Sequence, residues 1–226
     1  MTALTMYYHP LIKPGNASQS AAPTTVKPAN FDTGKDVDPE IVTLSRSPVF
    51  DNTIYSVFAD HVIDKKGHQV ERYLSVVPKC LSADAIAGVA VLPVKDGKVG
   101  LIRVFRHPLG RWSWESIKGH VESGEDVRTA AARELLEESG YSVASNEFID
   151  FGTVAPEAGV IKGRARLFTA AVTGAAGKAV DGELGHGKMA FYSRSEIDTL
   201  ITAGEIEDGI TLVILFKHLF RQNALE

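Results

Sequence analysis

Three shortages in this sequence exclude whole classes of protein. The 226-residue chain has one cysteine, Cys80, which excludes an internal disulfide framework and a zinc site built from cysteines. No apolar stretch approaches the roughly 20 residues that a membrane-spanning helix needs, and the first residues do not resemble a secretory leader. Basic residues are not in excess, because 24 Lys and Arg stand against 28 Asp and Glu. We therefore expect a cytoplasmic protein that binds neither a membrane nor nucleic acid.

The residues that are present divide the chain into three parts. Its 44% hydrophobic content allows a substantial core. Residues 1–45 are rich in Pro, Ser, Thr and Ala, which predicts an extended or disordered N-terminal arm. Residues 46–81 contain two β-rich runs around a turn at residues 64–67, which predicts a small antiparallel sheet. The main domain is expected over residues 82–226.

The pattern of the main domain predicts an α+β fold. A helix within residues 119–141 would be capped by Ser123 or Gly124 and would end at Gly140. A glycine-rich loop at residues 173–188 either carries function or is an idle connector. Further strands are predicted at residues 85–94, 98–107, 146–154, 164–173 and 188–192, and further helices at residues 194–203 and 209–222.

Residues 119–141 concentrate carboxylates on one predicted helix. With a helical advance of about 100° per residue, Glu134, Glu137 and Glu138 fall within a single arc of about 100°. Like charges at this spacing repel one another and weaken a helix. Either Arg133 pairs with Glu137 on an ordinary solvated face, or the carboxylates hold a cation.

The spacing of these residues is specific. It resembles the box of the Nudix hydrolases, G-x5-E-x7-R-E-U-x-E-E-x-G-U, in which U is a bulky apolar residue. Seven fixed letters at ordinary residue frequencies make a chance match in such a chain rarer than about one in a million. The resemblance extends over roughly residues 50–222 and implies the Nudix fold, a mixed β-sheet between helices. The matching residues are Gly119, Glu125, Arg133, Glu134, Leu135, Glu137, Glu138, Gly140 and Tyr141, the last being aromatic where the family usually has an aliphatic residue.

The resemblance implies a divalent metal site on this helix. Glu134 and Glu138 match metal ligands of the family, Glu137 matches a third ligand or an aid to the attacking water, and the backbone carbonyl of Lys118 matches a further ligand. Carboxylate and carbonyl oxygens suit Mg²⁺, the expected cofactor, with Mn²⁺ as the alternative. Glu125 lies on the opposite side of the helix and is expected to be structural.

Residues outside the box resemble one branch of this family, the ADP-ribose pyrophosphatases and nucleoside-diphosphate-sugar hydrolases. The segment VFRHPLGRWSWESIKG precedes the box, and Pro156, sixteen residues after Gly140, matches a proline of that branch. The upstream sheet resembles one that is exchanged between two subunits, so a homodimer is implied. The chain departs from the branch where Leu-Pro-Ala-Gly is replaced by residues 116–119 (Ser-Ile-Lys-Gly) and Ser-Pro-Gly by residues 155–157 (Ala-Pro-Glu).

Several side chains are candidates for substrate binding. Arg106 either matches a phosphate-contacting arginine of the branch or is an ordinary surface arginine, and Pro156 is a further predicted substrate contact. Arg164 and Arg166 alternate on a predicted strand and either line the site or face solvent. Trp112 and Trp114 share one strand face, where packing is favoured over base stacking. No paired metal-ligand spacing links the remaining candidates, so a structural or solvent-facing role is expected for His107, His120 and His186.

The attacking water needs a proton acceptor within hydrogen-bond reach. Related pyrophosphatases supply a glutamate from a mobile loop after the box, which favours Glu183 as the general base, with Glu137 as the alternative.

The expected function is Mg²⁺-dependent hydrolysis of the pyrophosphate bond of ADP-ribose or a related nucleoside diphosphate sugar, such as an ADP-sugar or a GDP-sugar. Two alternatives remain: hydrolysis of nucleoside triphosphates or dinucleoside polyphosphates, and a catalytically silent Nudix domain that senses nucleotides.

Overall fold

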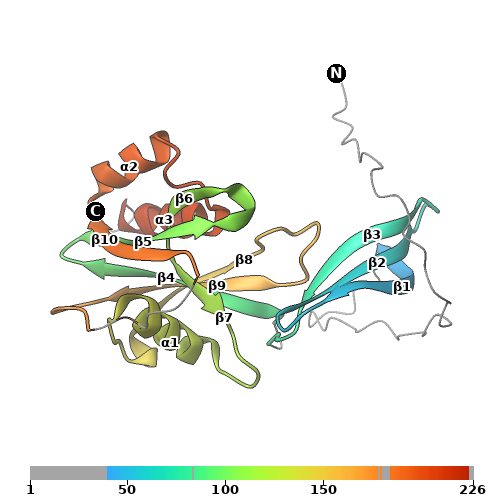
Figure 1. The fold of residues 1–226 in the computed structure, drawn as a ribbon, viewed down its shortest axis with the longest axis horizontal. Helices are drawn as coiled ribbons and strands as arrows, with labels where there is room; N and C mark the ends of the chain where they lie inside the picture. The colour runs from blue at the N-terminus through green and yellow to red at the C-terminus, as the bar shows by residue number, and fades with distance from the viewer. Residues whose placement is uncertain (1–39, 83, 178, 180–183, 224–226) are drawn as a thin grey trace.

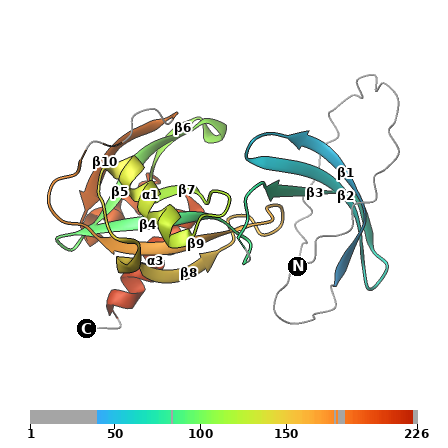
Figure 2. The same cartoon turned by 90° about the horizontal axis from the view of Figure 1, so that it is seen from below.

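The N-terminal part of the structure is a separate three-stranded antiparallel sheet. The computed structural model describes residues 40–82, 84–177, 179 and 184–223. Its first strands are β1 (Ile41–Asp51), β2 (Tyr55–Asp64) and β3 (Gln69–Pro78), in that spatial order. The sheet stands beside the rest of the chain in both views (Figures 1 and 2). The predicted turn between β2 and β3 is confirmed, since Gly67 has φ of 87° and its N–H donates to the Asp64 carbonyl oxygen at 3.1 Å.

The strand β1 was not predicted. It begins at Ile41, so the boundary predicted at residue 45 is too late, while residues 1–39 of the predicted arm lie outside the described residues. The strand pattern is hidden because β1 buries no residue fully and therefore lacks a core-facing alternation. The role of the N-terminal sheet in dimerisation stays a prediction. This sheet exposes the large apolar side chains Ile41, Val42, Leu44, Val49, Phe50, Val70 and Leu74.

Hydrogen bonds from β2 and β3 attach this sheet to the main domain. The Val76 N–H donates to the Val160 carbonyl at 2.9 Å, and the Lys162 N–H donates to the Val76 carbonyl at 2.8 Å. On β2, the Tyr55 hydroxyl lies 3.0 Å from Nε2 of His120. The sheet is thus fixed both to the loop after Pro156 and to the start of the acidic segment.

The main domain is built on a mixed sheet with the strand order β10-β5-β4-β9-β8. Strand β6 pairs with β5 and β7 pairs with β4; β4 and β9 run parallel, and the other pairs are antiparallel. The strands are β4 (Ile86–Lys95), β5 (Lys98–Arg106), β6 (Arg111–Glu115), β7 (Ile117–His120), β8 (Ile149–Val154), β9 (Arg164–Ala171) and β10 (His186–Tyr192). The helices are α1 (Val127–Ser139), α2 (Arg194–Thr202) and α3 (Gly209–Asn223), with short 3-10 turns η1 (His107–Leu109) and η2 (Ser145–Glu147).

Both faces of this sheet are covered by helices, which confirms the predicted α+β class. On β4, Val89 and Val91 pack into the core beneath α1, while Ala90 and Leu92 pack into the core that contains α2 and α3. A strand buried on both faces reads as a continuous apolar run. Figure 1 shows α1 on one side of the sheet and α2 with α3 on the other. Within the described part of the chain, none of the helices combines the length and apolar character that a bilayer crossing requires.

Asp60 on β2 supplies a test of what stabilises the N-terminal sheet. Its carboxylate is 2% exposed and accepts hydrogen bonds from Nε and Nη2 of Arg46, both at 2.7 Å, and from Oγ of Ser75 at 2.7 Å. Burial raises the pKa of this carboxyl, but the hydrogen bonds and charge of its partners outweigh burial and lower the pKa below its usual value. Its stabilisation is therefore present above the unfolded-state pKa of about 3.9 and is lost as the pH falls through the folded-state pKa.

We expect Asp60→Asn to lower the free energy of unfolding by about 1–3 kcal/mol at neutral pH, because it weakens a charge-assisted network. The difference from wild type should shrink as the pH falls below about 3.9. Urea unfolding across this pH range measures both effects. The exposed Glu71→Gln on β3 is the control, and an equal cost for both variants would contradict the role of the network.

Candidate functional site

The ends of α1 are set by two local features. Asp126 is the N-cap, because its carboxylate accepts hydrogen bonds from the Arg128 N–H at 2.9 Å and the Thr129 N–H at 3.4 Å. The predictions of Ser123 and Gly124 as the N-cap were wrong, because these residues lie three and two positions before Asp126. The predicted end at Gly140 is confirmed, since Gly140 has φ of 73° and its N–H donates to the Leu136 carbonyl.

Glycine is required at the C-terminus of α1 for a second reason. A Cβ atom on Gly140 would lie 2.3 Å from the carbonyl oxygen of Gly177. The Gly177 N–H in turn donates to the Gly140 carbonyl at 2.9 Å. The end of the acidic helix is therefore joined to the start of the glycine-rich loop.

Glu134 faces the sheet from α1, beside the apolar residues of the same helix. It is 7% exposed, and Ala131 and Leu135 next to it are fully buried. Its carboxylate lies directly against Gly119 on β7, where an added Cβ atom would be 1.8 Å from Oε1 of Glu134. Gly119 therefore leaves the space that Glu134 occupies, and it follows Lys118, whose carbonyl is a predicted ligand.

Arg133 binds the carboxylates that crowd this helix. Its guanidinium donates to Glu125 (Nε to Oε1, 3.0 Å), to Glu134 (Nη1 to Oε1, 2.8 Å) and to Glu137 (Nη1 to Oε2, 3.2 Å). It also donates from Nη2 to the His120 carbonyl at 2.9 Å. The hydrogen bonds that Arg133 donates to Glu125 are the largest cause of the raised Arg133 pKa, so this residue stays cationic. One cation relieves part of the repulsion, and the Arg133–Glu137 pair, one of the two alternatives, is present. The predicted placement of Glu125 on the opposite side of the helix is wrong, because Glu125 precedes α1 and shares the Arg133 guanidinium with Glu134.

Glu138 lies at the other edge of the acidic face. Its side chain is 4% exposed, and its Oε1 is 3.9 Å from Nδ1 of His186 on β10. The sequence predicted only a structural or solvent-facing role for His186. Glu138 lies 48 positions earlier in the chain, and a separation of this length does not predict a contact. The contact arises from the pairing of β10 with β5, which sequence spacing does not encode.

The donor set suits a hard divalent cation. Buried carboxylates at Glu134 and Glu138, a more exposed one at Glu137, and the carbonyl on the adjacent β7 are all oxygen ligands. The space at Gly119 admits the Glu134 carboxylate next to that strand. In the described residues no three His, Cys, Asp or Glu side chains are gathered as a metal site, which fits the engagement of Glu134 and Glu137 by Arg133.

The other predicted residues are distributed around the domain. Arg106 at the end of β5 donates to Glu115 from Nε at 3.0 Å and from Nη2 at 2.6 Å. These hydrogen bonds are the largest cause of its raised pKa, and the charge of Glu138 adds to it, so Arg106 lies within electrostatic range of the acidic helix. Arg164 donates to the Asp84 carbonyl at 3.2 Å, and Arg166 forms an ion pair with Asp150 on β8.

Arg106 thus pairs with Glu115, and its charge also interacts with that of Glu138, while Arg164 and Arg166 contact other elements. Pro156 is exposed in the loop after β8. Glu183 lies outside the described residues. Of the two tryptophans on β6, Trp114 packs against the core and contacts Tyr192, as expected, whereas Trp112 contacts Phe105 but is 43% exposed.

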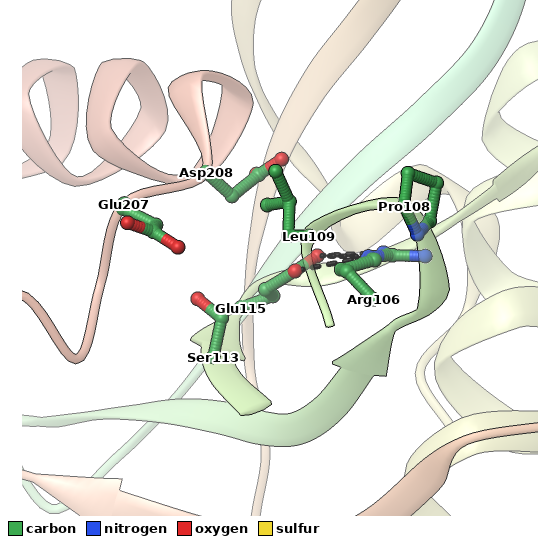
Figure 3. Close-up of a pocket in the computed structure, with 7 residues that line it drawn as sticks. All are labelled: Arg106, Pro108, Leu109, Ser113, Glu115, Glu207 and Asp208. Carbon is green, nitrogen blue, oxygen red and sulfur yellow. Dashed lines mark hydrogen bonds and ion pairs between the residues drawn. The ribbon is translucent and has the colours of Figure 1, made fainter. Parts of the chain in front are cut away.

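A cavity of about 240 Å³ lies next to Arg106 (Figure 3). Its walls come from η1, β6 and the segment before α3. Beneath it, Nζ of Lys118 is 2.6 Å from Glu115 and 2.7 Å from Asp208. The cavity is lined by Arg106, Pro108, Leu109, Ser113, Glu115, Glu207 and Asp208.

A mixed sheet between helices, with a glutamate-rich helix packed against a glycine-containing strand, defines an α+β domain with carboxylates gathered on one helix. The NUDIX domain matches residues 84–206, more than half of the chain. The chain therefore belongs to the NUDIX family, as the box predicted.

Individual relatives are similar to parts of the chain. An ADP-ribose pyrophosphatase of Bacillus subtilis (strain 168) is 32% identical over 101 residues, 44% of this chain and 50% of the relative. An ADP-ribose pyrophosphatase of Saccharomyces cerevisiae is 44% identical over 62 residues, 26% of this chain and 27% of the relative. The matches thus span half or less of these relatives. A solved structure described as an ADP compounds hydrolase superposes with a TM-score of 0.68 at 15% identity, covering 84% of this chain and 98% of that one, which shows the shared fold.

The contact between Gly119 and Glu134 predicts the effect of one added methyl group. We expect Gly119→Ala to displace the Glu134 carboxylate and to weaken divalent metal binding by about 10- to 100-fold, the usual range for changes beside a metal ligand. Titration with Mn²⁺ followed by electron paramagnetic resonance measures this affinity without substrate. The control is Gly159→Ala, whose Cβ would make an ordinary contact at 3.5 Å with Glu157. A folded Gly119→Ala protein with wild-type affinity would show that Glu134 is not a ligand.

Proposed function

We propose that the protein is a Mg²⁺-dependent hydrolase of the pyrophosphate bond in ADP-ribose or a related nucleoside diphosphate sugar. The observation that carries this proposal is the burial of Glu134 and Glu138 on one helix beside Gly119. Buried like charges are costly unless a cation balances them. The similarity to ADP-ribose pyrophosphatases supports this substrate class.

In this proposal Glu134, Glu138 and the Lys118 carbonyl hold the metal, with Glu137 as a further ligand. The metal would neutralise charge on the diphosphate and orient the attacking water. Arg106, which is charged and held by Glu115, binds a phosphate oxygen. Arg164, Arg166 and Pro156 remain predicted substrate contacts. Cleavage gives a nucleoside monophosphate and a sugar phosphate, and a carboxylate accepts the proton of the water.

The two alternatives differ from this proposal in substrate or in catalysis. Triphosphates and dinucleoside polyphosphates would use the same carboxylates, so the metal site does not distinguish them. A silent sensing domain would not need its carboxylates, and the retention of the full box at residues 119–141 favours an enzyme.

The substrate class is tested with a panel of compounds. We expect wild-type protein with Mg²⁺ to cleave ADP-ribose, ADP-glucose or GDP-mannose in preference to diadenosine polyphosphates and nucleoside triphosphates, as measured by phosphate release after phosphatase treatment. Glu138→Gln should lower kcat at least about 100-fold, because it removes a metal ligand. The exposed Glu122→Gln is the matched control. Tight binding of a nucleotide without cleavage of any compound would favour the sensing domain instead.

The general base is tested by comparing Glu183→Gln with Glu137→Gln. Loss of the base should lower kcat by about 10²- to 10⁴-fold and remove the acidic limb of the pH–rate profile, while Mn²⁺ affinity stays unchanged. Near-normal turnover in Glu183→Gln would eliminate Glu183 and leave Glu137. If Glu137→Gln instead weakens Mn²⁺ binding, Glu137 is a ligand.

A further inference from the structure

His186 on β10 lies against the more deeply buried of the two proposed carboxylate ligands. The side chain of Glu138 is 4% exposed and that of His186 is 15% exposed, compared with 10% for the side chain of Glu134. The contact joins β10 to α1, two elements that are far apart in the chain. The imidazole therefore lies at the buried edge of the proposed metal site.

Two glycines hold the backbone of His186 close to β5. The Gly185 carbonyl accepts a hydrogen bond from the Phe105 N–H at 2.8 Å, and Gly185 has φ of 82°. An added Cβ atom on Gly185 would lie 2.8 Å from the Phe105 carbonyl oxygen, and one on Gly187 would lie 3.0 Å from the Arg103 carbonyl oxygen. A larger residue at either position would push β10 away from β5. The position of His186 is thus fixed from both sides.

A shift in the strand register begins at His186. This residue pairs with Val104 on β5, and the next pair joins Met189 to Ile102, so β10 advances three residues where β5 advances two. An extra residue in one strand bends that strand and changes the direction of the side chains beside it. The shift explains how a side chain at the start of β10 is directed toward α1.

The distance between the two side chains suits a shared cation. Nδ1 of His186 is 3.9 Å from Oε1 of Glu138, which is too long for a direct hydrogen bond. A hydrogen-bonded histidine–carboxylate pair in the same protein, His68 with Asp64, is 2.8 Å apart. Two donor atoms that each bind one divalent cation at about 2.1 Å are separated by at most about 4.2 Å. The gap at His186 therefore has the width that a cation between the two side chains requires.

We propose that His186 is a nitrogen ligand of the divalent metal that Glu134 and Glu138 hold. This inference rests on the proposed metal-dependent hydrolysis and adds a donor of a different kind to the site. Oxygen donors suit Mg²⁺, whereas an imidazole nitrogen raises the affinity for later transition-metal ions such as Ni²⁺. The site therefore binds Ni²⁺ relative to Mg²⁺ more tightly than the carboxylates and the carbonyl alone would.

The test is pulsed electron paramagnetic resonance of Mn²⁺ bound to the untagged 226-residue chain, without substrate. A directly bound imidazole couples its ¹⁴N nucleus to the unpaired electrons of the metal. We expect this coupling in wild-type protein, its loss in His186→Ala, and its replacement by ¹⁵N coupling when only the histidines carry ¹⁵N. The labelling needs no substitution, so it tests histidine ligation even if the variant does not fold. The control is His68→Ala, which also removes an imidazole from a carboxylate and should keep the coupling.

Competition for the same site gives a second measurement. Ni²⁺ and Mg²⁺ are each titrated against bound Mn²⁺, and the ratio of the Ni²⁺ affinity to the Mg²⁺ affinity is determined. We expect His186→Ala to lower this ratio about tenfold, because Ni²⁺ loses a preferred nitrogen donor and Mg²⁺ does not. The ratio for His68→Ala should equal that of wild type.

The outcomes separate this inference from the proposed function. Mn²⁺ that binds to wild-type protein without nitrogen coupling, or with coupling that persists in His186→Ala, overturns His186 as a ligand and leaves the carboxylate site standing. If wild-type protein binds no Mn²⁺, the metal site of the proposed function fails, and the nitrogen ligand fails with it.

Discussion

Repulsion among the glutamates of α1 is the constraint on which the rest of the site depends. Two of these carboxylates are nearly buried, where charges repel strongly unless a cation lies close by. Arg133 meets part of this need with hydrogen bonds to Glu125, Glu134 and Glu137. Because a guanidinium binds through directed N–H groups, it also fixes the rotamers of the carboxylates. The edge of the helix with Glu134 and Glu138 is where the proposed metal would bind.

The sheet explains why this helix can be so acidic. The apolar residues of α1 pack on β4 and β7, and β4 is buried on its other face by the core under α3. Hydrophobic burial on this scale stabilises the domain independently of the charged face. Gly119 then permits the Glu134 carboxylate to approach the backbone of β7. Packing thus supplies the stability, and the absence of a side chain at one position supplies the space.

A second charged network links the site to the far side of the sheet. Arg106, Glu115, Lys118 and Asp208 alternate in charge from the end of β5 to the start of α3. Glu115 is 1% exposed, so its two cationic partners balance it where water does not. Networks of this kind contribute little net stability compared with apolar packing, and their value lies in fixing geometry. The cavity beside Arg106 takes its charge pattern from this network.

The sequence predicted what depends on local spacing. The box, the Arg133–Glu137 pair and the glycine that ends α1 all follow from helical periodicity or from the backbone angle of one residue. Strand β4 was found because burial on both faces leaves an apolar run, whereas the four-residue strand β7 was not predicted. The strand β1 and the N-cap Asp126 were missed, because β1 has no buried alternation and several neighbouring residues were suitable caps.

By itself, the sequence determined the family, the acidic helix and the class of chemistry, because each rests on residues fixed by short-range spacing. Only the tertiary structure decided that His186 lies beside Glu138, that Arg166 pairs with Asp150, and that Lys118 joins Glu115 to Asp208. The physical reason is that these contacts join residues from separate elements. Their meeting depends on strand pairing and on which helix covers which face of the sheet, and neither is encoded in the distance between residues along the chain.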